Sequence, residues 1–242
     1  MQVPILQIQD KINPNNYNND DIYLITQFYI PSDEKRYNEI KTCLRRNLES
    51  GFFKKICLIN EKEYSKEELG LNDKEIKKIQ QVVFNSGTRL KYSQAFGLIK
   101  HLKLKGYIVI SNSDIFVDET INNIRKSSIS EEKAIYALLR FDFTEKRLRD
   151  CKMFGPRPDS QDAWIIHSNF LPSDIEIIKC DFFLGSQGCD NHLAFLFLQY
   201  GYKIYNEPCV IKIYHYHTEQ KRNYTLPPIS PPWLFVAPVI RN

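Results

Sequence analysis

The sequence lacks the features of a membrane-spanning or disulfide-stabilised protein. No apolar run approaches the roughly 20 residues of a membrane-spanning helix, and residues 233–240 are too few and contain Pro238. Residues 1–7 lack the basic flank and the sustained apolar core of a signal peptide. The six cysteines form no C-x-x-C pair and no compact framework spacing, which predicts reduced, mostly buried thiols. We therefore expect a cytoplasmic protein with no membrane span.

Charge of one sign is not concentrated in this chain either. The 33 Lys and Arg residues are scattered among 29 Asp and Glu residues, which leaves a formal net charge of +4. A nucleic-acid-binding protein needs a concentrated basic face, so we expect no nucleic-acid partner. A mildly basic balance suits an enzyme that holds a diphosphate. The 242 residues, 43% of them hydrophobic, are enough to bury one sizeable core.

Strands and helices alternate in the first half of the chain. Short apolar runs predict strands at residues 22–29, 55–60, 81–85 and 107–111. Helical spacing of apolar residues predicts helices at residues 34–50 and 92–104, with a charged helical stretch at 66–79. This alternation indicates an α/β fold with parallel strands, in which ligands bind beyond the carboxyl ends of the strands.

The pattern becomes mixed beyond residue 118. Strands are predicted at residues 135–142, 163–167, 202–206 and 210–217, with a helix at 191–200. We expect an amino-terminal arm and loop at residues 1–21, one domain at 22–217 and a Pro-rich tail at 218–242. The domain is expected to have two halves, at 22–118 and 119–217. The tail is expected to wrap the surface, and the sheet of the domain is expected to be mixed.

Oxygen-bearing side chains cluster where the strand at 107–111 ends. Asn112 and Asp114 lie two residues apart, so on an extended backbone they face the same side. A carboxylate and an amide oxygen aimed together form half a site for a hard divalent cation, which prefers oxygen ligands and bridges phosphates. Asp114 could equally belong to an ordinary polar turn. Asp118 is predicted to cap a helix at 119–126.

A second group of polar side chains lies in the last third of the chain. Asp190 opens the helix at 191–200, where glycines allow a tight turn and the positive helix terminus favours a carboxylate. It is either an N-cap or a general base whose ionised form the helix dipole stabilises. His215 and His217 alternate with Tyr216, so both can face one side of a strand. One of the two histidines is expected to be inert.

The order of these features resembles that of the GT-A glycosyltransferases, particularly the small viral and bacterial members, over residues 22–217. The run N-S-D at residues 112–114 is similar to their D-x-D metal motif, and C-D-N at 189–191 is similar to the acidic motif of inverting members. This resemblance implies a GT-A-like mixed sheet and makes Asp190 the catalytic base. The D-x-D motif by itself is a weak signal.

The resemblance also implies a metal ion. Asp114 and a late histidine, either His215 or His217, would hold Mn²⁺ or Mg²⁺ on a nucleotide-sugar donor. The sequence departs from the motif at Asn112, which replaces the first aspartate and puts direct metal ligation there in doubt.

The remaining candidates surround these motifs. Residues expected to contact the donor follow the first, third and fourth strands: Thr26, Gln27, Phe28, Asn85, Arg89, Asn112 and Ser113. Core packing explains Phe28 equally well. On the acceptor side, the run S-Q-D-A-W at 160–164 resembles the loop of related sequences. Within it we expect Asp162 to face the site, with Trp164 either a sugar platform or a core residue.

These observations predict a metal-dependent transferase that moves a sugar from a nucleotide diphosphate donor, with UDP favoured by the resemblance, to a glycan or glycoconjugate acceptor. Asp190 would act as the base, and the anomeric configuration would invert. One alternative is a sugar nucleotidyltransferase, but its Gly-rich phosphate loop is missing because residues 22–33 contain no glycine. A second alternative is a non-catalytic carbohydrate-binding module, which Asn112 keeps open.

Overall fold

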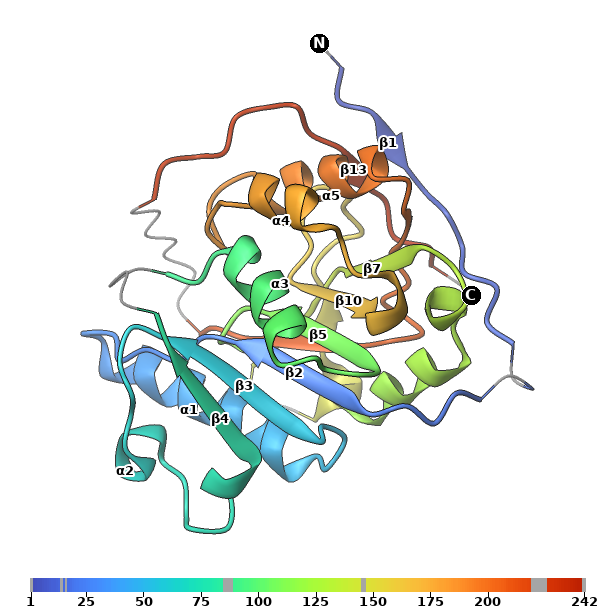
Figure 1. Ribbon diagram of the computed structural model, residues 1–242. Coiled ribbons are helices and arrows are strands. Elements are labelled where there is room, and N and C mark those ends of the chain that lie inside the picture. The colour runs from blue at the N-terminus through green and yellow to red at the C-terminus, as the bar shows by residue number, and fades with distance from the viewer. Residues whose placement is uncertain are drawn as a thin grey trace.

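The computed structural model describes residues 2–13, 15, 17–84, 89–144, 147–218 and 226–240. Its centre is a seven-stranded sheet with strand order β11-β7-β10-β5-β2-β3-β4 (Figure 1). The strands are β2 (Ile22–Thr26), β3 (Lys55–Asn60), β4 (Ile79–Val83), β5 (Tyr107–Ser111), β7 (Ala134–Leu138), β10 (Ala163–His167) and β11 (Lys203–Tyr205). β10 runs antiparallel to β5 and β7, whereas the other neighbouring pairs are parallel. The predicted mixed α/β sheet is therefore confirmed.

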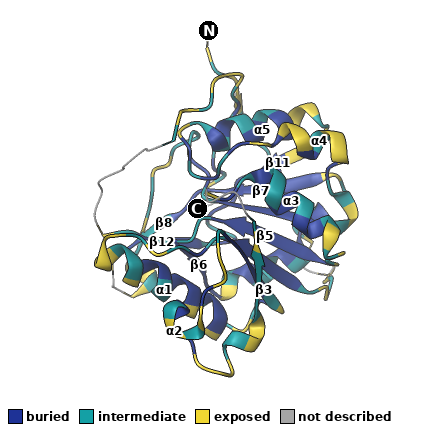
Figure 2. Ribbon diagram, turned by 60° about the vertical axis from the view of Figure 1, so that its left-hand side comes forward, coloured by how far each residue is buried: buried dark blue, intermediate teal, exposed yellow. Residues whose placement is uncertain are grey.

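Helices cover both faces of this sheet (Figure 1). One face packs against α1 (Glu34–Glu49) and the 3-10 helix at Glu119–Lys126, with α2 (Lys66–Leu69) at the edge. The other face packs against α3 (Tyr92–His101), α4 (Asp174–Lys179) and α5 (Cys189–Gln199). Figure 2 shows the strands buried between these layers, with exposed residues on the outer sides of the helices.

Helix α1 shows how the sequence sets this packing. Asp33 caps its amino terminus by accepting hydrogen bonds from the backbone N–H groups of Lys35 and Arg36. Ile40, Leu44 and Leu48 follow at helical spacing and are all buried. Burying each of these side chains stabilises the fold by roughly 1.5–3 kcal/mol.

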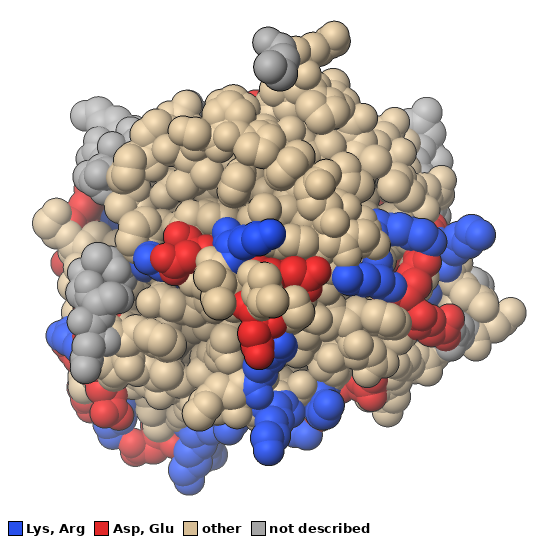
Figure 3. Space-filling model, turned by 45° about the horizontal axis from the view of Figure 1, so that its top comes forward, with Lys and Arg blue, Asp and Glu red and all other residues tan. Residues whose placement is uncertain are grey.

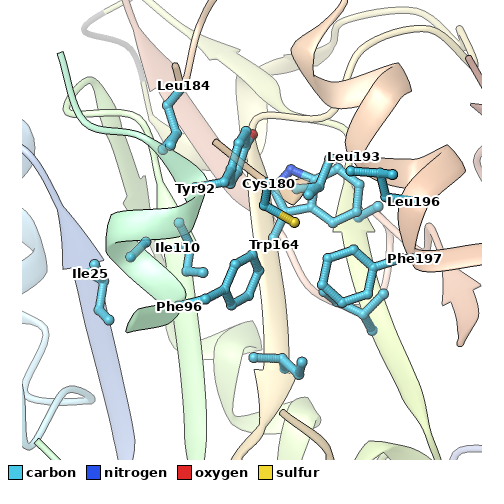
Figure 4. Packing of buried hydrophobic residues seen from close by; sticks show 14 of the residues in the cluster. Ile25, Tyr92, Phe96, Ile110, Trp164, Cys180, Leu184, Leu193, Leu196 and Phe197 are labelled. Carbon is cyan, nitrogen blue, oxygen red and sulfur yellow. The ribbon is translucent and has the colours of Figure 1, made fainter. Parts of the chain in front are cut away.

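The opposite core is aromatic. Trp164 of β10 is 1% exposed and stacks on Phe197 of α5, with ring centroids 6.2 Å apart. Tyr92 meets the same indole edge to face at 6.5 Å, and Figure 4 shows these rings together with Phe96 inside the cluster. Trp164 is therefore a core residue and not a sugar platform.

A second, four-stranded sheet with the order β6-β12-β8-β9 extends the fold beyond β5. Its strands are β6 (Ile115–Val117), β8 (Phe141–Phe143), β9 (Lys152–Met153) and β12 (Ile213–Tyr216). The single strand predicted at 135–142 is wrong, because β7 ends at Leu138 and β8 continues in the other sheet. The helix predicted at 66–79 is also wrong, since Gly70 ends α2 in the left-handed conformation. Asp118 does cap the 3-10 helix that follows it.

The two ends of the chain meet. β1 (Ile5–Leu6) pairs in parallel with β13 (Phe235–Val236) (Figure 1). Leu234 and Val236 are 2% and 0% exposed and belong to the core beside α5. Residues 227–228 and 230–232 are exposed, as a surface wrap predicts. The tail differs from that expectation at Leu234 and Val236, which complete the core.

The distribution of charged side chains and the burial of the cysteines agree with what the composition predicts. On the face shown in Figure 3, acidic and basic side chains are interspersed along a band, with a largely uncharged area above it. Four of the six free cysteines are buried: Cys43, Cys57, Cys180 and Cys189. Among the described residues, no helix has the length and apolar character needed to cross a membrane.

Candidate active site

A cleft of about 1000 Å³ lies at the carboxyl ends of β2 and β5. Its walls are the loop after β2, the first turn of α1, the turn after β5, the loop entering α5 and the carboxyl-terminal segment at 226–240. Charged side chains of both signs line it: Asp33, Lys35, Arg36, Glu39, Arg89, Asp114, Arg140, Arg157, Asp159, Asp162 and Asp190. Such a volume is at the upper end of small-molecule sites, so it can hold an extended polar ligand.

Asp114, His215 and His217 converge in this cleft. One potential ligand atom from each lies within 4.8 Å of the other two. The register of β12 on β6 places them together, because His215 pairs with Ile115 and the Tyr216 N–H donates to the Asp114 carbonyl at 2.9 Å. Tyr216 points into a small aromatic core, so the two histidines lie on one face of the strand, as their alternation predicts.

Arg36, which the sequence did not single out, contacts the same carboxylate. Its Nη2 lies 2.5 Å from Asp114 Oδ2, and His215 Nε2 lies 3.0 Å from that oxygen. Nη1 of Arg36 donates to Glu39 Oε2 at 3.0 Å. Glu39 Oε1 in turn accepts from the backbone N–H and the hydroxyl of Thr218, at 2.6 and 2.7 Å. These contacts tie the first turns of α1 to the chain that follows β12.

A buried asparagine holds α1 at this place. Asn47 Nδ2 donates to the Ile115 carbonyl at 2.9 Å, and its Oδ1 accepts from the Val117 N–H at 3.1 Å. Both bonds join α1 to the edge of β6, next to Asp114. The position of Arg36 therefore depends on tertiary packing, and its local sequence carries no signal of it.

The charges in this cluster are strongly coupled. Although burial opposes ionisation, His215 and Arg36 hold the pKa of Asp114 well below its usual range. His215 is also buried, yet Asp114 raises its pKa to about 9, with a contribution from Asp142. Burial and the nearby Arg36 lower the pKa of His217. At neutral pH the metal-free cluster thus contains an ionised carboxylate, a protonated His215 and a neutral His217.

These residues fit a divalent metal ion. Asp114 Oδ1 is buried and has no hydrogen-bond partner among the described residues, which leaves a charged oxygen available as a ligand. One carboxylate and two imidazoles suit Mn²⁺ better than Mg²⁺, because imidazole is a transition-metal ligand and Mg²⁺ prefers oxygen. Binding through His215 requires loss of its proton.

A chain of alternating charges leads from this triad to the other side of the cleft. Asp142 Oδ1 lies 3.8 Å from His215 Nδ1 and 3.1 Å from Arg140 Nε. Nη1 of Arg140 donates to both carboxylate oxygens of Asp162, at 2.9 and 3.0 Å. Asp162 thus faces the cleft as expected, and its carboxylate is held by Arg140.

Asp190 lies beside Asp162, at the second position of α5. Its Oδ1 accepts from the Cys189 thiol at 2.9 Å, and its Oδ2 accepts from the Gln161 N–H at 3.2 Å. The helix N-cap is Gly188, with φ of 80° and no side-chain capping bond. Asp190 is therefore not the N-cap. Burial raises the pKa of Asp190 to about 6, the Cys189 thiol opposes the rise, and the charge of Asp162 adds to it.

Burial thus outweighs the hydrogen bonds that favour the ionised carboxylate of Asp190. A carboxylate that titrates near pH 6 and faces a cleft can accept a proton from a bound hydroxyl group.

Arg89 and Asn112 meet at a glycine in the loop before α5. Arg89 Nη1 lies 3.5 Å from the Gly185 carbonyl oxygen. A Cβ added at Gly185, where φ is 73°, would lie 3.1 Å from Arg89 Nη1 and 3.7 Å from Asn112 Oδ1. The absence of a side chain lets the loop approach both residues. Ser113 lines the cleft next to them.

The residues after β2 divide between cleft and core. Gln27 lines the cleft, and its Oε1 accepts from the Leu90 N–H at 2.8 Å. Thr26 and Phe28 are 6% and 1% exposed, and Phe28 packs edge to face on Tyr64. Phe28 is therefore a core residue and not a donor contact. Asn85 lies outside the described residues.

No family model matches this sequence, and no curated protein sequence matches it. Solved structures share its fold. The mannosyltransferase PcManGT from Pyrobaculum calidifontis, in complex with GDP-Man and Mn²⁺, is 13% identical with a TM-score of 0.57, over 90% of this chain and 62% of that one. GalNAc-T7 with UDP, GalNAc and Mn²⁺ is 14% identical with a TM-score of 0.55. The match covers 86% of this chain and 45% of that one.

At these identities the likeness is one of fold, and the fold is GT-A-like, as the sequence resemblance implied. The chain spans less than two thirds of the length of either neighbour.

Proposed function

We propose that this protein is a metal-dependent glycosyltransferase, which moves a sugar from a nucleoside diphosphate donor to a hydroxyl group of a glycan or glycoconjugate. The observation that carries the proposal is that one cleft contains both a carboxylate–imidazole triad and a second carboxylate with a pKa near 6. The first arrangement suits a metal–diphosphate, and the second suits a general base.

The donor half of the proposed site lies at the carboxyl ends of β2 and β5. Asp114, His215 and His217 would hold Mn²⁺, and Arg89, on the loop side of the cleft, would contact the diphosphate. A divalent ion bound there neutralises charge on the leaving diphosphate. Asn112, Ser113 and Gln27 line the cleft, and we assign them the hydrogen bonds to the nucleotide. We propose UDP as the nucleotide on the sequence resemblance; of the two solved neighbours, one contains UDP and the other GDP-Man.

The acceptor half is centred on Asp190. Its carboxylate takes the proton of the acceptor hydroxyl while that oxygen bonds to the anomeric carbon and the bond from this carbon to the diphosphate oxygen breaks. Attack opposite the leaving group inverts the configuration. Asp162 is already paired with Arg140, so we assign it the role of raising the pKa of Asp190 and contacting acceptor hydroxyls, not of removing the proton.

A titration with nucleotides tests this function. Calorimetry with UDP and GDP, with and without Mn²⁺, should show binding that requires the metal. A thermal-shift panel of UDP-sugars and GDP-mannose should then identify the donor, because a ligand that binds only the folded state raises its stability. The absence of Mn²⁺-dependent binding of either nucleotide would contradict the proposal and favour a non-catalytic carbohydrate-binding module.

A further inference from the structure

The two tryptophans of this chain have different environments. Trp164 is buried in the core, whereas Trp233 lines the cleft together with Phe235. Nothing in the proposed donor and base chemistry uses either of these cleft aromatics. An indole in a largely polar cleft therefore calls for a ligand with an apolar face.

The indole of Trp233 lies against the turn that leads to Asp190. A Cβ added at Gly188 would lie 3.3 Å from Trp233 Nε1 and 3.4 Å from its Cε2. Nε1 donates to the Ile229 carbonyl at 3.1 Å, and the Ile229 N–H donates to the Gln187 carbonyl at 2.8 Å. The indole is thus held against Gly188, which precedes the proposed base by two residues in the sequence.

The segment that carries Trp233 is anchored to the residue after Asp190 and to the loop at 157–162. The Leu234 N–H donates to the Asn191 carbonyl at 2.9 Å, and the Val236 N–H donates to the Pro158 carbonyl at 2.8 Å. Leu234 and Val236 are themselves buried in the core. The aromatic ring therefore has a fixed position, which lowers the entropy cost of stacking a ligand on it.

Charged groups from the loop at 157–162 line the same cleft. Arg157 and Asp159 form a pair with Nη2 and Oδ2 2.5 Å apart, and both side chains are about one third exposed. Such groups offer donors and acceptors for ligand hydroxyls. An aromatic surface combined with charged hydrogen-bonding groups suits a pyranose ring, which has an apolar C–H face and a polar rim.

We propose that Trp233 is the stacking platform of a saccharide subsite next to Asp190, which binds a hexopyranose ring of the acceptor. The identification of the bound saccharide as the acceptor rests on the proposed function. The binding of a saccharide at Trp233 does not. The indole contacts Gly188, which precedes Asp190 by two residues, and both Trp233 and Asp190 line the cleft, so the subsite adjoins the proposed base.

Tryptophan fluorescence tests the subsite directly. In the Trp164→Phe variant, Trp233 is the sole tryptophan. Under excitation that is selective for tryptophan over tyrosine, it should respond saturably to at least one of the methyl glycosides of glucose, galactose and mannose. Sorbitol, which has hydroxyl groups but no ring, is the matched control and should give no response. If Trp164→Phe fails to fold, the difference between the parent and Trp233→Phe reports the same signal, because Trp233→Phe keeps only the core Trp164.

Calorimetry with the responding glycoside completes the test. Trp233→Ala should weaken binding by roughly 3- to 10-fold, the range expected for an aromatic contact, and Trp233→Phe should retain most of it. The titrations contain EDTA and no nucleotide, so their result is independent of metal and donor chemistry. No response to any of the three glycosides would overturn the proposal, as would a response of Trp233 to UDP or GDP but not to glycosides, which would assign the indole to the donor.

Discussion

The guanidinium of Arg36 and the carboxylate of Asp114 form an ion pair beside the triad, with Nη2 2.5 Å from Oδ2 and side chains only 19% and 8% exposed. The cleft therefore contains a fixed positive charge at the point where a metal ion would bind. Breaking a buried pair by removing one partner leaves the other charge without compensation.

Removing the charge of Arg36 should strengthen Mn²⁺ binding. Arg36→Gln lowers the positive potential around Asp114, so we expect several-fold tighter binding of Mn²⁺ in calorimetry without nucleotide. Lys35→Gln is the matched control, because Lys35 also lines the cleft but lies on the exposed side of α1. Weaker Mn²⁺ binding in Arg36→Gln would show that Arg36 supports the metal instead of competing with it.

Asp114→Asn should cost stability as well as metal binding. The variant leaves Arg36 and His215 without their anion, and the expected loss in the free energy of unfolding is about 3–5 kcal/mol, the scale for breaking a buried pair. Urea unfolding at neutral pH measures it. The double variant with Arg36→Gln should recover part of the loss, as expected for residues in contact. Strictly additive losses would contradict the pairing.

Both histidines should matter for the metal. His215→Ala and His217→Ala should each need more Mn²⁺ for half-maximal nucleotide binding, because ligand atoms of both lie within reach of Asp114. His101→Ala, at the exposed end of α3, controls for the loss of an imidazole. This prediction replaces the expectation that one of the pair is inert. A silent His217 variant would restore that expectation.

Asp190→Asn should separate transfer from donor binding. We expect transfer to fall by about 10²-fold or more, the scale for loss of a general base, while Mn²⁺-dependent nucleotide affinity is unchanged. In the parent, transfer should rise as the pH increases through about 6, because the base acts in its deprotonated form. Measuring both quantities in one preparation decides the matter, and retained transfer in the variant would exclude Asp190 as the base.

The thiol of Cys189 should tune this pH dependence. It donates to Asp190 Oδ1 at 2.9 Å and so favours the ionised carboxylate. Cys189→Ala removes that donor and should move the acidic limb of the activity profile to higher pH. Cys189→Ser supplies a stronger donor and should move it to lower pH. The same substitutions at Cys180, a buried thiol bonded to the Glu176 carbonyl, should leave the limb in place.

Local sequence determined most of the framework. The apolar runs at 55–60, 107–111 and 163–167 predict strands with the observed bounds, because buried strands carry a strong short-range signal. Clustered oxygen-bearing side chains after β5 likewise marked the edge of the sheet where Asp114 lies. The alternation of His215 with Tyr216 placed the two histidines on one strand face, since the side-chain period of a strand is two.

Tertiary structure alone decided which charges meet. Arg36 comes from α1, 78 residues before Asp114. Arg140 reaches Asp162 because β10 pairs with β7, with Ala163 opposite Leu138. The pKa of Asp190 depends on burial and on Asp162, which nothing in the residues around it specifies. Trp233 enters the cleft because the tail pairs with the amino-terminal arm. Such contacts join segments that are distant in sequence, so they follow from packing and not from any local pattern.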